Sequence, residues 1–409
     1  MTEALNRSFD SLRIPNYRRF FAGQLVSISG NWMQTVAELW LILLLTGSGV
    51  AVGFTTALQF LPMLLVGAWG GLIADRLPKR RLLIATQTLH MLPPLTLFAL
   101  ALTGTVTPAA VFAIAFSRGV VNAVDYPTRQ AFVMEMVGPG RVVNAVSLNS
   151  VLVHASRIIG PAVAGVLIAT VGVEPCFALN AASFAVMVVA LAGMDTDSLR
   201  PAELAPREPA AVRAGLRYVR GNPQLWIPLG LMAIVGTLGF NFQAILPLLA
   251  RFTFDGGASA YAALVTAMGM GAVIGALANG ARGRVSPGLL AGAAIGFGAL
   301  ALLAAGAPSM AIEVAVLAPL GAASVTLAAS VNSALQLASD PIMRGRVMAL
   351  YSVVFLGSTP IGAPLAGWLS EAIDPRAALV MAGVAALTAG LLARLAFARV
   401  AADERLALA

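Results

Sequence analysis

Long apolar runs separated by short polar connections dominate the pattern of this chain. A helix needs roughly 20 mostly apolar residues to cross a bilayer, and twelve runs of about that length or longer can be placed. The pattern therefore predicts an all-α integral membrane protein with twelve transmembrane helices and little chain left for a soluble domain. The runs lie near residues 20–46, 50–74, 82–103, 108–129, 143–169, 175–195, 223–250, 259–280, 288–306, 309–332, 346–370 and 377–399.

The composition is that of a polytopic membrane protein. Of the 409 residues, 59% are apolar and 11% are charged, whereas a soluble domain typically carries about 25% charged residues. Cys176 is the single cysteine, so an intramolecular disulfide is excluded. Because Met1 to Pro15 is polar and the first apolar run is long, we expect no cleavable signal peptide.

The cations are distributed unequally between the two sides of the predicted membrane. A net charge of +8 by itself would be compatible with nucleic-acid binding. If the N-terminus is cytoplasmic, however, 22 of the 26 Lys and Arg residues fall in the N-terminal arm, the even-numbered connections and the C-terminus. This asymmetry follows the positive-inside rule. It predicts a multi-pass protein of the bacterial cytoplasmic membrane with both termini in the cytoplasm and no nucleic-acid partner.

The chain is expected to be a duplication of a six-helix half. The long polar connection 196–222 contains three prolines and divides the spans six and six, which predicts an N-terminal half (1–195), a cytoplasmic linker and a C-terminal half (223–409). At an offset of 202, residues 148–167 match 350–369 at nine of twenty positions. Within the linker, Ala210 to Arg220 could form an amphipathic helix on the membrane surface.

The turn after the second run carries the most specific motif. Residues 71–81 read GLIADRLPKRR, and 275–284 repeat the outline 204 residues later. The motif resembles the G-x-x-x-D-R-x-x-R-R signature of major facilitator transporters. The resemblance implies two six-helix halves and alternating access, with Asp75 and Arg76 helping to latch the halves on the cytoplasmic side; a solvated turn is the simpler alternative. The latch residues implied are Gly71, Asp75, Arg76 and Arg80, with Asn279 in place of the aspartate in the second half.

A narrower resemblance covers the fourth to sixth spans. The segments 125–132 (DYPTRQAF), 144–150 (NAVSLNS) and 180–184 (NAASF) are similar to the enterobactin-exporter and macrolide-efflux branch, whose members are drug:proton antiporters. The motif Gly160-Pro161-x-x-x-Gly165 between them resembles the fifth-span signature of proton-driven exporters. It implies a helix bend that shapes the central cavity, although close helix packing would also explain these residues.

Three spans of the N-terminal half carry polar stripes at helical spacing. Ionisable side chains within a membrane are costly, and each is a functional hypothesis by default. The spacing of three to four residues places each set on one helical face, which we expect to point inward. The stripes comprise Ser27, Asn31, Gln34 and Glu38; Arg118, Asn122, Asp125 and Arg129; and Ser150, His154, Arg157 and Pro161.

Glu38 is the principal candidate for a proton carrier. Burial favours the neutral form of a carboxyl group and a nearby arginine favours its charged form, so small movements can switch its protonation. The alternative is a permanent structural ion pair with Arg118 or Arg157. We predict proton coupling by Glu38, Arg118, Asp125 and Arg157.

A substrate site is predicted near the midplane between the halves. Polar stripes combined with aromatic residues suit amphipathic ligands, and the predicted cavity residues are Asn31, Trp32, Gln34, Asn122, His154, Phe240 and Asn241, with Trp40, Phe60 and Phe242 nearby. No catalytic constellation, Walker lysine or metal-ligand cluster is recognisable, so we expect a transporter without cofactor or metal rather than an enzyme.

The sequence thus favours a proton-coupled exporter of a siderophore or drug. Its expected partners are protons, membrane lipids and a small-molecule substrate, and we expect it to act as a monomer. Two alternatives stay open: a proton-coupled importer of a small solute, and a lipid scramblase or membrane assembly factor without proton coupling.

Overall fold

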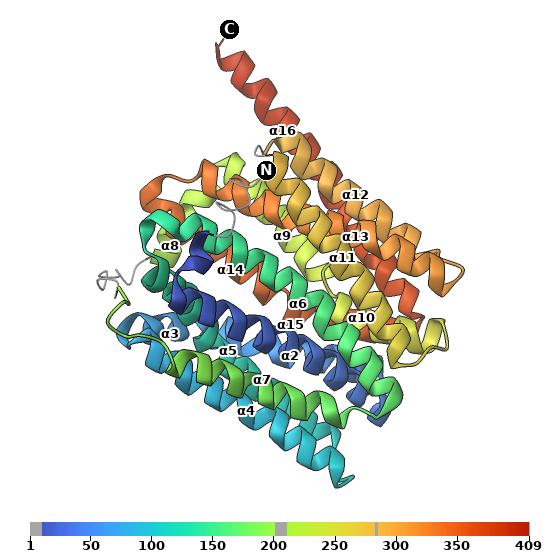
Figure 1. Cartoon of the computed structure of the whole chain (residues 1–409). Coiled ribbons are helices and arrows are strands. Elements are labelled where there is room, and N and C mark those ends of the chain that lie inside the picture. Colours follow the sequence, from blue (N-terminus) through green and yellow to red (C-terminus); the bar gives the residue numbers. More distant parts are fainter. Residues whose placement is uncertain (1–9, 201–210, 283–284, 409) are drawn as a thin grey trace. The chain divides into compact units, whose positions relative to one another are not determined.

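The computed structural model describes residues 10–200, 211–282 and 285–408, within which no β-strand occurs. Twelve helices are long and apolar enough to cross a membrane, which confirms the predicted fold class. Most connections between them are only a few residues long (Figure 1). The elements are η1 (Asp10–Arg13), α2 (Pro15–Thr46), α3 (Gly49–Arg76), α4 (Lys79–Leu102), α5 (Pro108–Val137), η2 (Pro139–Arg141), α6 (Val142–Thr170), α7 (Glu174–Ala192), α8 (Ala211–Arg220), α9 (Pro223–Leu238), α10 (Phe242–Leu248), η3 (Leu249–Thr253), α11 (Ala258–Arg282), α12 (Pro287–Ala305), α13 (Met310–Ala338), α14 (Pro341–Gly357), α15 (Thr359–Ala372) and α16 (Pro375–Leu408).

Two predicted spans are interrupted in the structure. The run 223–250 breaks after Leu238 and continues as α10 and the π-helical segment η3. The run 346–370 changes from α14 to α15 next to Pro360, which lacks a backbone N–H and cannot donate a helical hydrogen bond. Hydropathy does not reveal such breaks because the residues around them are apolar. The short helix predicted in the linker is confirmed as α8.

The chain forms two compact units. The first comprises Met1–Gly47, Leu58–Pro206 and Gly257–Thr266, and the second comprises Ser48–Ala57, Arg207–Gly256 and Ala267–Ala409. In the first unit α4 packs against α5 and α7, and α2 packs against α5, α6 and α7. In the second unit α12 packs against α13 and α16, and α9 packs against α13, α15 and α16. The same packing scheme thus occurs in both units, as a duplication requires.

Two helices contribute to both units. The start of α3 (48–57) counts with the second unit, and the start of α11 (257–266) counts with the first. Glycines allow the close approach: a Cβ at Gly367 of α15 would clash with the Gly49 carbonyl of α3. Gly165 of α6, which the 202-residue offset pairs with Gly367, would likewise clash with Ala262 of α11. The repeated glycines therefore mark equivalent helix crossings.

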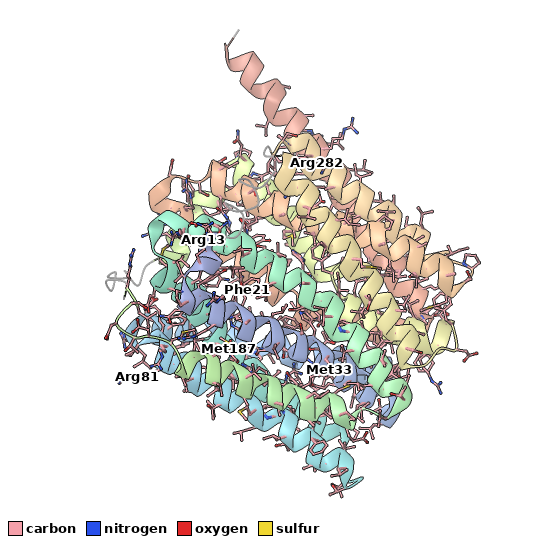
Figure 2. The ribbon with its side chains drawn as sticks, viewed as in Figure 1. Arg13, Phe21, Met33, Arg81, Met187 and Arg282 are labelled. Carbon is pink, nitrogen blue, oxygen red and sulfur yellow. The ribbon has the colours of Figure 1, made fainter. Side chains whose placement is uncertain are left out.

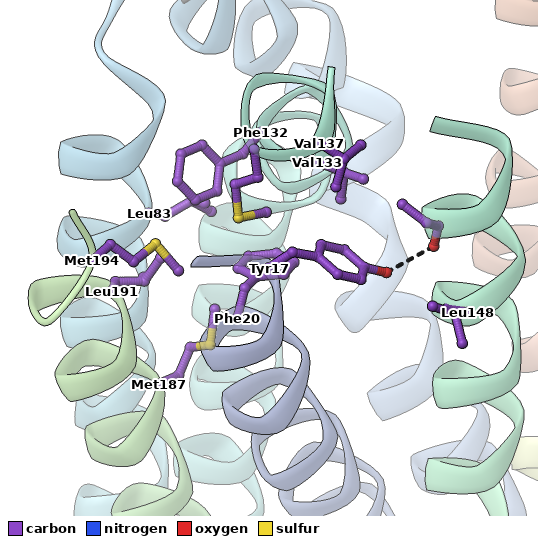
Figure 3. Packing of buried hydrophobic residues seen from close by; sticks show 12 residues of the cluster. Tyr17, Phe20, Leu83, Phe132, Val133, Val137, Leu148, Met187, Leu191 and Met194 are labelled. Carbon is purple, nitrogen blue, oxygen red and sulfur yellow. Dashed lines mark hydrogen bonds between the residues drawn. The ribbon is translucent and has the colours of Figure 1, made fainter. Parts of the chain in front are cut away.

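An apolar cluster holds one end of the first unit together (Figure 3). Phe20 of α2 stacks edge-on against Phe132 of α5, with ring centroids 5.7 Å apart. The Tyr17 hydroxyl donates to the Ala145 carbonyl of α6 at 2.9 Å, which satisfies a polar atom that burial would otherwise leave unpaired. Figure 2 shows Arg81 projecting from this part of the unit, whereas Met33 lies farther along α2 among the helices.

Candidate functional site

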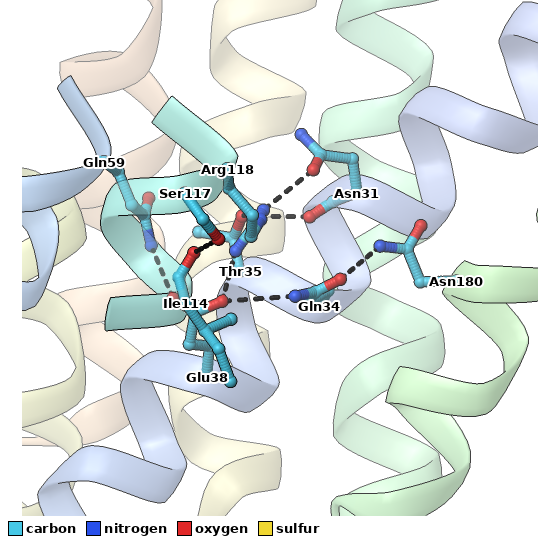
Figure 4. Close-up of polar contacts among 9 residues, drawn as sticks. All are labelled: Asn31, Gln34, Thr35, Glu38, Gln59, Ile114, Ser117, Arg118 and Asn180. Carbon is cyan, nitrogen blue, oxygen red and sulfur yellow. Dashed lines mark hydrogen bonds and ion pairs between the residues drawn. The ribbon is translucent and has the colours of Figure 1, made fainter. Parts of the chain in front are cut away.

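Glu38 and Arg118 form a buried ion pair in the first unit (Figure 4). Glu38 is fully buried on α2, and Arg118 on α5 is 4% exposed. Arg118 Nη1 donates to Glu38 Oε2, while Nη2 donates to Asn31 Oδ1 at 2.8 Å and to Thr35 Oγ1 at 3.4 Å. A buried pair is tolerated only when its remaining polar atoms are also satisfied, and α2 supplies these partners at helical spacing.

The pair is embedded in a network from four helices. Gln34 Nε2 donates to Glu38 Oε2 and Gln59 Nε2 of α3 donates to Glu38 Oε1, both at 3.3 Å. Asn180 of α7 donates in turn to Gln34 Oε1. Gly119 permits the close approach of α5 to α3, since a Cβ there would lie 2.6 Å from the Gln59 carbonyl oxygen. Glu38 therefore accepts hydrogen bonds from three different helices, so its charge is tied to the packing of all of them.

Asp125 forms a second buried carboxylate cluster farther along α5. It is 1% exposed and pairs with Arg129, one helical turn away. Thr86 Oγ1 and Gln87 Nε2 of α4 donate to its Oδ1 at 2.7 and 2.8 Å. Gln87 also accepts from Ser27 of α2, so the cluster joins three helices. Both predicted carboxylates are thus buried, and each has its own arginine.

Arg157 and His154 of α6 lie outside the Glu38 network. The Arg157 guanidinium lies over the Trp32 ring at 4.9 Å from its centroid, a cation–π contact. Its buried Nε has no hydrogen-bond partner, and the same holds for the buried Nδ1 of His154. Of the two arginines proposed as partners of Glu38, Arg118 forms the ion pair, whereas Arg157 contacts Trp32. Ser150, the first member of the α6 stripe, is exposed.

The remaining predicted substrate residues are distributed over both units. Asn122 lies half-buried on α5 between the two ion pairs. In the second unit Asn241 is buried, donates to the Thr237 carbonyl at 2.7 Å and leaves its Oδ1 without a partner. Phe240 packs edge-on against Phe297. Trp40, named with this group, is buried and stacks on Tyr261, so it serves packing in the first unit.

The predicted latch residues flank the short turn between α3 and α4: Gly71, Asp75 and Arg76 lie at the end of α3, and Arg80 lies at the start of α4. Asp75 and Arg76 are exposed. Arg80 instead donates to the Leu191 and Ala192 carbonyls at the end of α7, both at 2.8 Å, and so satisfies carbonyl groups that a helix end leaves open. Next to it, Lys79 forms an ion pair of 3.0 Å with Glu135 of α5. Arg80 and Lys79 thus hold the first unit together at this turn.

The glycines of the Gly160-Pro161-x-x-x-Gly165 motif lie at close helix contacts. A Cβ at Gly160 would clash with the Ser29 carbonyl of α2, and one at Gly165 would clash with Ala262. The helix α6 continues through Pro161 to Thr170. Close packing therefore explains both glycines, and a cavity-shaping bend stays a prediction.

Neighbouring spans contribute partners of Glu38 and Asp125 that lie outside the three polar stripes. Gln59 is a single polar residue in an otherwise apolar stretch, whereas Thr86 and Gln87 belong to a short polar group with Thr88 and His90; polar residues within these runs were the available signal. Glu135 was not predicted because it lies beyond the run 108–129, in the predicted connection, where a charged residue is common; in the structure α5 extends to Val137. Within the described ranges no group of three or more His, Cys, Asp or Glu side chains could hold a metal ion.

Comparison with known proteins places these features in context. The profile of a major facilitator family described as transmembrane secretion effector matches residues 6–407. The staphyloferrin A transporter of Staphylococcus aureus is 28% identical over 262 residues, which cover 63% of this chain and 65% of that protein, just under two thirds of its length. The enterobactin exporter EntS of Escherichia coli O127:H6 is 25% identical over 389 residues, which cover 92% and 91% of the two chains.

Solved structures show the same fold at much lower sequence identity. A mutant form of the nucleoside transporter NupG superimposes with a TM-score of 0.77 at 13% identity, covering 94% of this chain and all of that one. A bacterial homolog of the human lysosomal transporter Spinster gives a TM-score of 0.74 at 14% identity and covers 94% and 97% of the two chains. At these identities the likeness concerns the fold alone.

Proposed function

Because the chain belongs to the transmembrane secretion effector family of the major facilitator superfamily, we propose that it exports a small amphipathic compound, such as a siderophore or a drug, in exchange for protons. The protein is a multi-pass membrane transporter, not an enzyme. We propose that it resides in the bacterial cytoplasmic membrane as a monomer. The relatives named for enterobactin export and staphyloferrin A transport support a siderophore-like substrate.

The Glu38–Arg118 pair is the observation that carries the proton-coupling proposal. A coupling group must exist in a charged and a neutral form, and each form must favour a different arrangement of helices. Ionised Glu38 attracts Arg118 and accepts from Gln34 and Gln59. When a proton binds, this attraction is lost and α2, α3 and α5 are held together less strongly. Proton binding at Glu38 would therefore bias the conformational equilibrium, with Asp125 as a second carboxylate on the same helix as Arg118.

The surroundings of Arg157 support an anionic or hydroxyl-rich aromatic substrate. Trp32 offers a ring face, and the unpartnered Arg157 Nε and His154 Nδ1 remain able to hydrogen-bond. Polar groups of this kind orient a ligand, while aromatic surface supplies the apolar contact. We propose that Asn31, Gln34 and Asn122 in the first unit, and Phe240 and Asn241 in the second, also contact substrate.

The proposal is tested by gradient-driven transport in inside-out membrane vesicles that contain the purified chain. With an acidic lumen, an antiporter of this kind should accumulate iron-free enterobactin in the vesicle, and a protonophore should abolish the uptake. Accumulation driven by the opposite gradient would indicate a proton-coupled importer. Substrate or lipid movement that ignores the gradient would support a scramblase and contradict proton coupling.

The proposed orientation places both termini in the cytoplasm. Single cysteines at Ser198→Cys and Ser286→Cys, in a background with the buried Cys176 replaced by alanine, should resist an impermeant thiol reagent added outside intact cells. The positive-inside asymmetry is the physical reason. Thr105→Cys lies in the connection between α4 and α5 and should be labelled readily. Labelling of either of the first two cysteines from outside would overturn this orientation.

Asp75 is proposed to act on conformation rather than on substrate, because it lies exposed in the last turn of α3. Asp75→Asn should slow transport and shift the distances between spin labels placed on the two units. Substrate affinity should stay within about threefold, which is under 1 kcal/mol. The exposed Asp197→Asn is the matched control and should change neither property. A large loss of affinity with unchanged distances would contradict the latch.

A further inference from the structure

Glu313 is a buried carboxyl group that the proposed mechanism does not use. It lies in the first turn of α13 and is 0% exposed. Neither Oε1 nor Oε2 has a hydrogen-bond partner. Among the described residues of the second unit, no other acidic side chain is buried. Glu38 and Asp125, by contrast, each have an arginine and further donors.

One arginine acts on the Glu313 carboxyl group. Arg376 at the start of α16 acts electrostatically on Glu313. Its Nη2, however, donates to the Ala307 carbonyl at 2.7 Å, and its buried Nε has no partner. Arg376 thus keeps an unused donor, while its Nη2 is engaged with the carbonyl of Ala307, six residues before Glu313. Its backbone N–H donates to the exposed Asp374 at 2.8 Å.

Other elements packed around α13 and α16 offer no alternative partner for the carboxyl group. The helices α9 and α12 contain no titratable residue. Arg251 of η3, which packs against α16, is exposed. Arg282 lies in the last turn of α11. Arg344 and Arg346 of α14 follow the last turn of α13, whereas Glu313 lies in its first turn. Arg376 is therefore the described cation that can exchange partners with Glu313.

An ionised carboxylate without hydrogen-bond donors or a paired cation is costly to bury, whereas a neutral carboxylic acid is much less so. We propose that Glu313 and Arg376 form a second proton-binding site, in which Glu313 holds a proton in the conformation described here. On release the O–H bond of Glu313 breaks, the proton passes to water and the Arg376 guanidinium turns from the Ala307 carbonyl to the carboxylate. The role of this site in transport rests on the proposed proton coupling. The binding of a proton to Glu313 does not depend on that proposal.

Occupancy is tested by labelling the whole purified protein with an apolar carbodiimide, which reacts with protonated buried carboxyl groups. Peptide mass spectrometry should find the label on Glu313 at neutral pH, and labelling should decline as the pH rises. Glu38, which is paired with Arg118 and accepts from Gln34 and Gln59, should be labelled much less. Glu313 without label over the whole pH range of stability would overturn the site. Protection by sodium ions at constant pH would also overturn it, because the ligand would then be a metal cation.

The role of Arg376 is tested by Arg376→Gln in the same experiment. Without the cation that stabilises the carboxylate, labelling of Glu313 should persist to a pH about one unit higher or more. An unchanged pH profile would remove Arg376 from the site.

The number of protons exchanged per substrate tests whether Glu313 takes part in coupling. Glu313→Gln should retain gradient-driven export but lower the number of protons exchanged per substrate, while Asp255→Asn, an exposed acid of the same unit, should leave this ratio unchanged. An unaltered ratio in Glu313→Gln would contradict a coupled role. If the wild type shows no proton coupling at all, the proposed function fails. The labelling result then still decides whether Glu313 binds a proton.

Discussion

Glu38→Gln should reduce gradient-driven export to the level of protein-free vesicles while substrate binding survives. Glutamine keeps the size of the side chain, and its single carbonyl oxygen can still accept from Arg118, although the hydrogen bond from Gln59 to the second oxygen is lost. It cannot bind and release a proton. Substrate affinity should stay within about threefold, and its dependence on pH should flatten. The measurement is uptake into inside-out vesicles with an acidic lumen, together with equilibrium binding in detergent.

The matched control is Glu135→Gln. Glu135 is also a buried carboxylate paired with a cation in the first unit, but it lies at the turn beside Lys79 and outside the polar stripes. This variant should keep a steep dependence of export on the proton gradient. If Glu38→Gln exports against a gradient at the wild-type rate, Glu38 is not the carrier and Asp125 becomes the candidate.

Arg118→Gln should destabilise the protein far more than a typical surface substitution. It leaves Glu38 fully buried without its cation and also removes the bond to Asn31. Breaking a buried pair by removing one partner typically costs about 3–5 kcal/mol, because the remaining charge is uncompensated. The expected result is a marked fall in the midpoint of thermal unfolding in detergent and a lower yield of monodisperse protein.

The double variant Glu38→Gln with Arg118→Gln separates stability from coupling. Once both charges are gone, most of the lost thermal stability should return, whereas proton-driven export should stay absent. Wild-type stability in Arg118→Gln alone would mean that the Glu38–Arg118 ion pair contributes little to the folded state. That outcome would remove the physical basis of the coupling proposal.

Hydropathy predicted the membrane helices well because a span must be apolar over most of its length. It could not predict the interruption after Leu238 or the junction at Ser358, since both lie within apolar sequence. The 202-residue repeat correctly paired Gly165 with Gly367 as equivalent positions. Only the structure shows what they contact, because a glycine at a helix crossing and one at a bend look alike in sequence.

The candidate site was predicted where one helix supplied several polar residues. Asn31, Gln34 and Glu38 lie on one face of α2, and spacing alone reveals this. The choice between Arg118 and Arg157 depends on how α5 and α6 are rotated against α2, which spacing within a single helix does not encode. Glu313 gives no such signal, because it lies near the end of its run and no polar residue follows it within two helical turns. It is nevertheless buried, since depth along a span and burial among helices are separate quantities.

The helices α3 and α11 each begin in one unit and continue in the other, and this affects where they can bend. The backbone of α3 passes from the second unit to the first at Leu58. Pro62, four residues later, has no N–H to donate to the Leu58 carbonyl, so one backbone hydrogen bond of the helix is missing at this boundary. The helix α11 changes unit after Thr266 and has Gly269 and Gly271 just beyond, residues that make a helix easier to deform. Each shared helix is therefore easiest to bend beside the point where it changes unit.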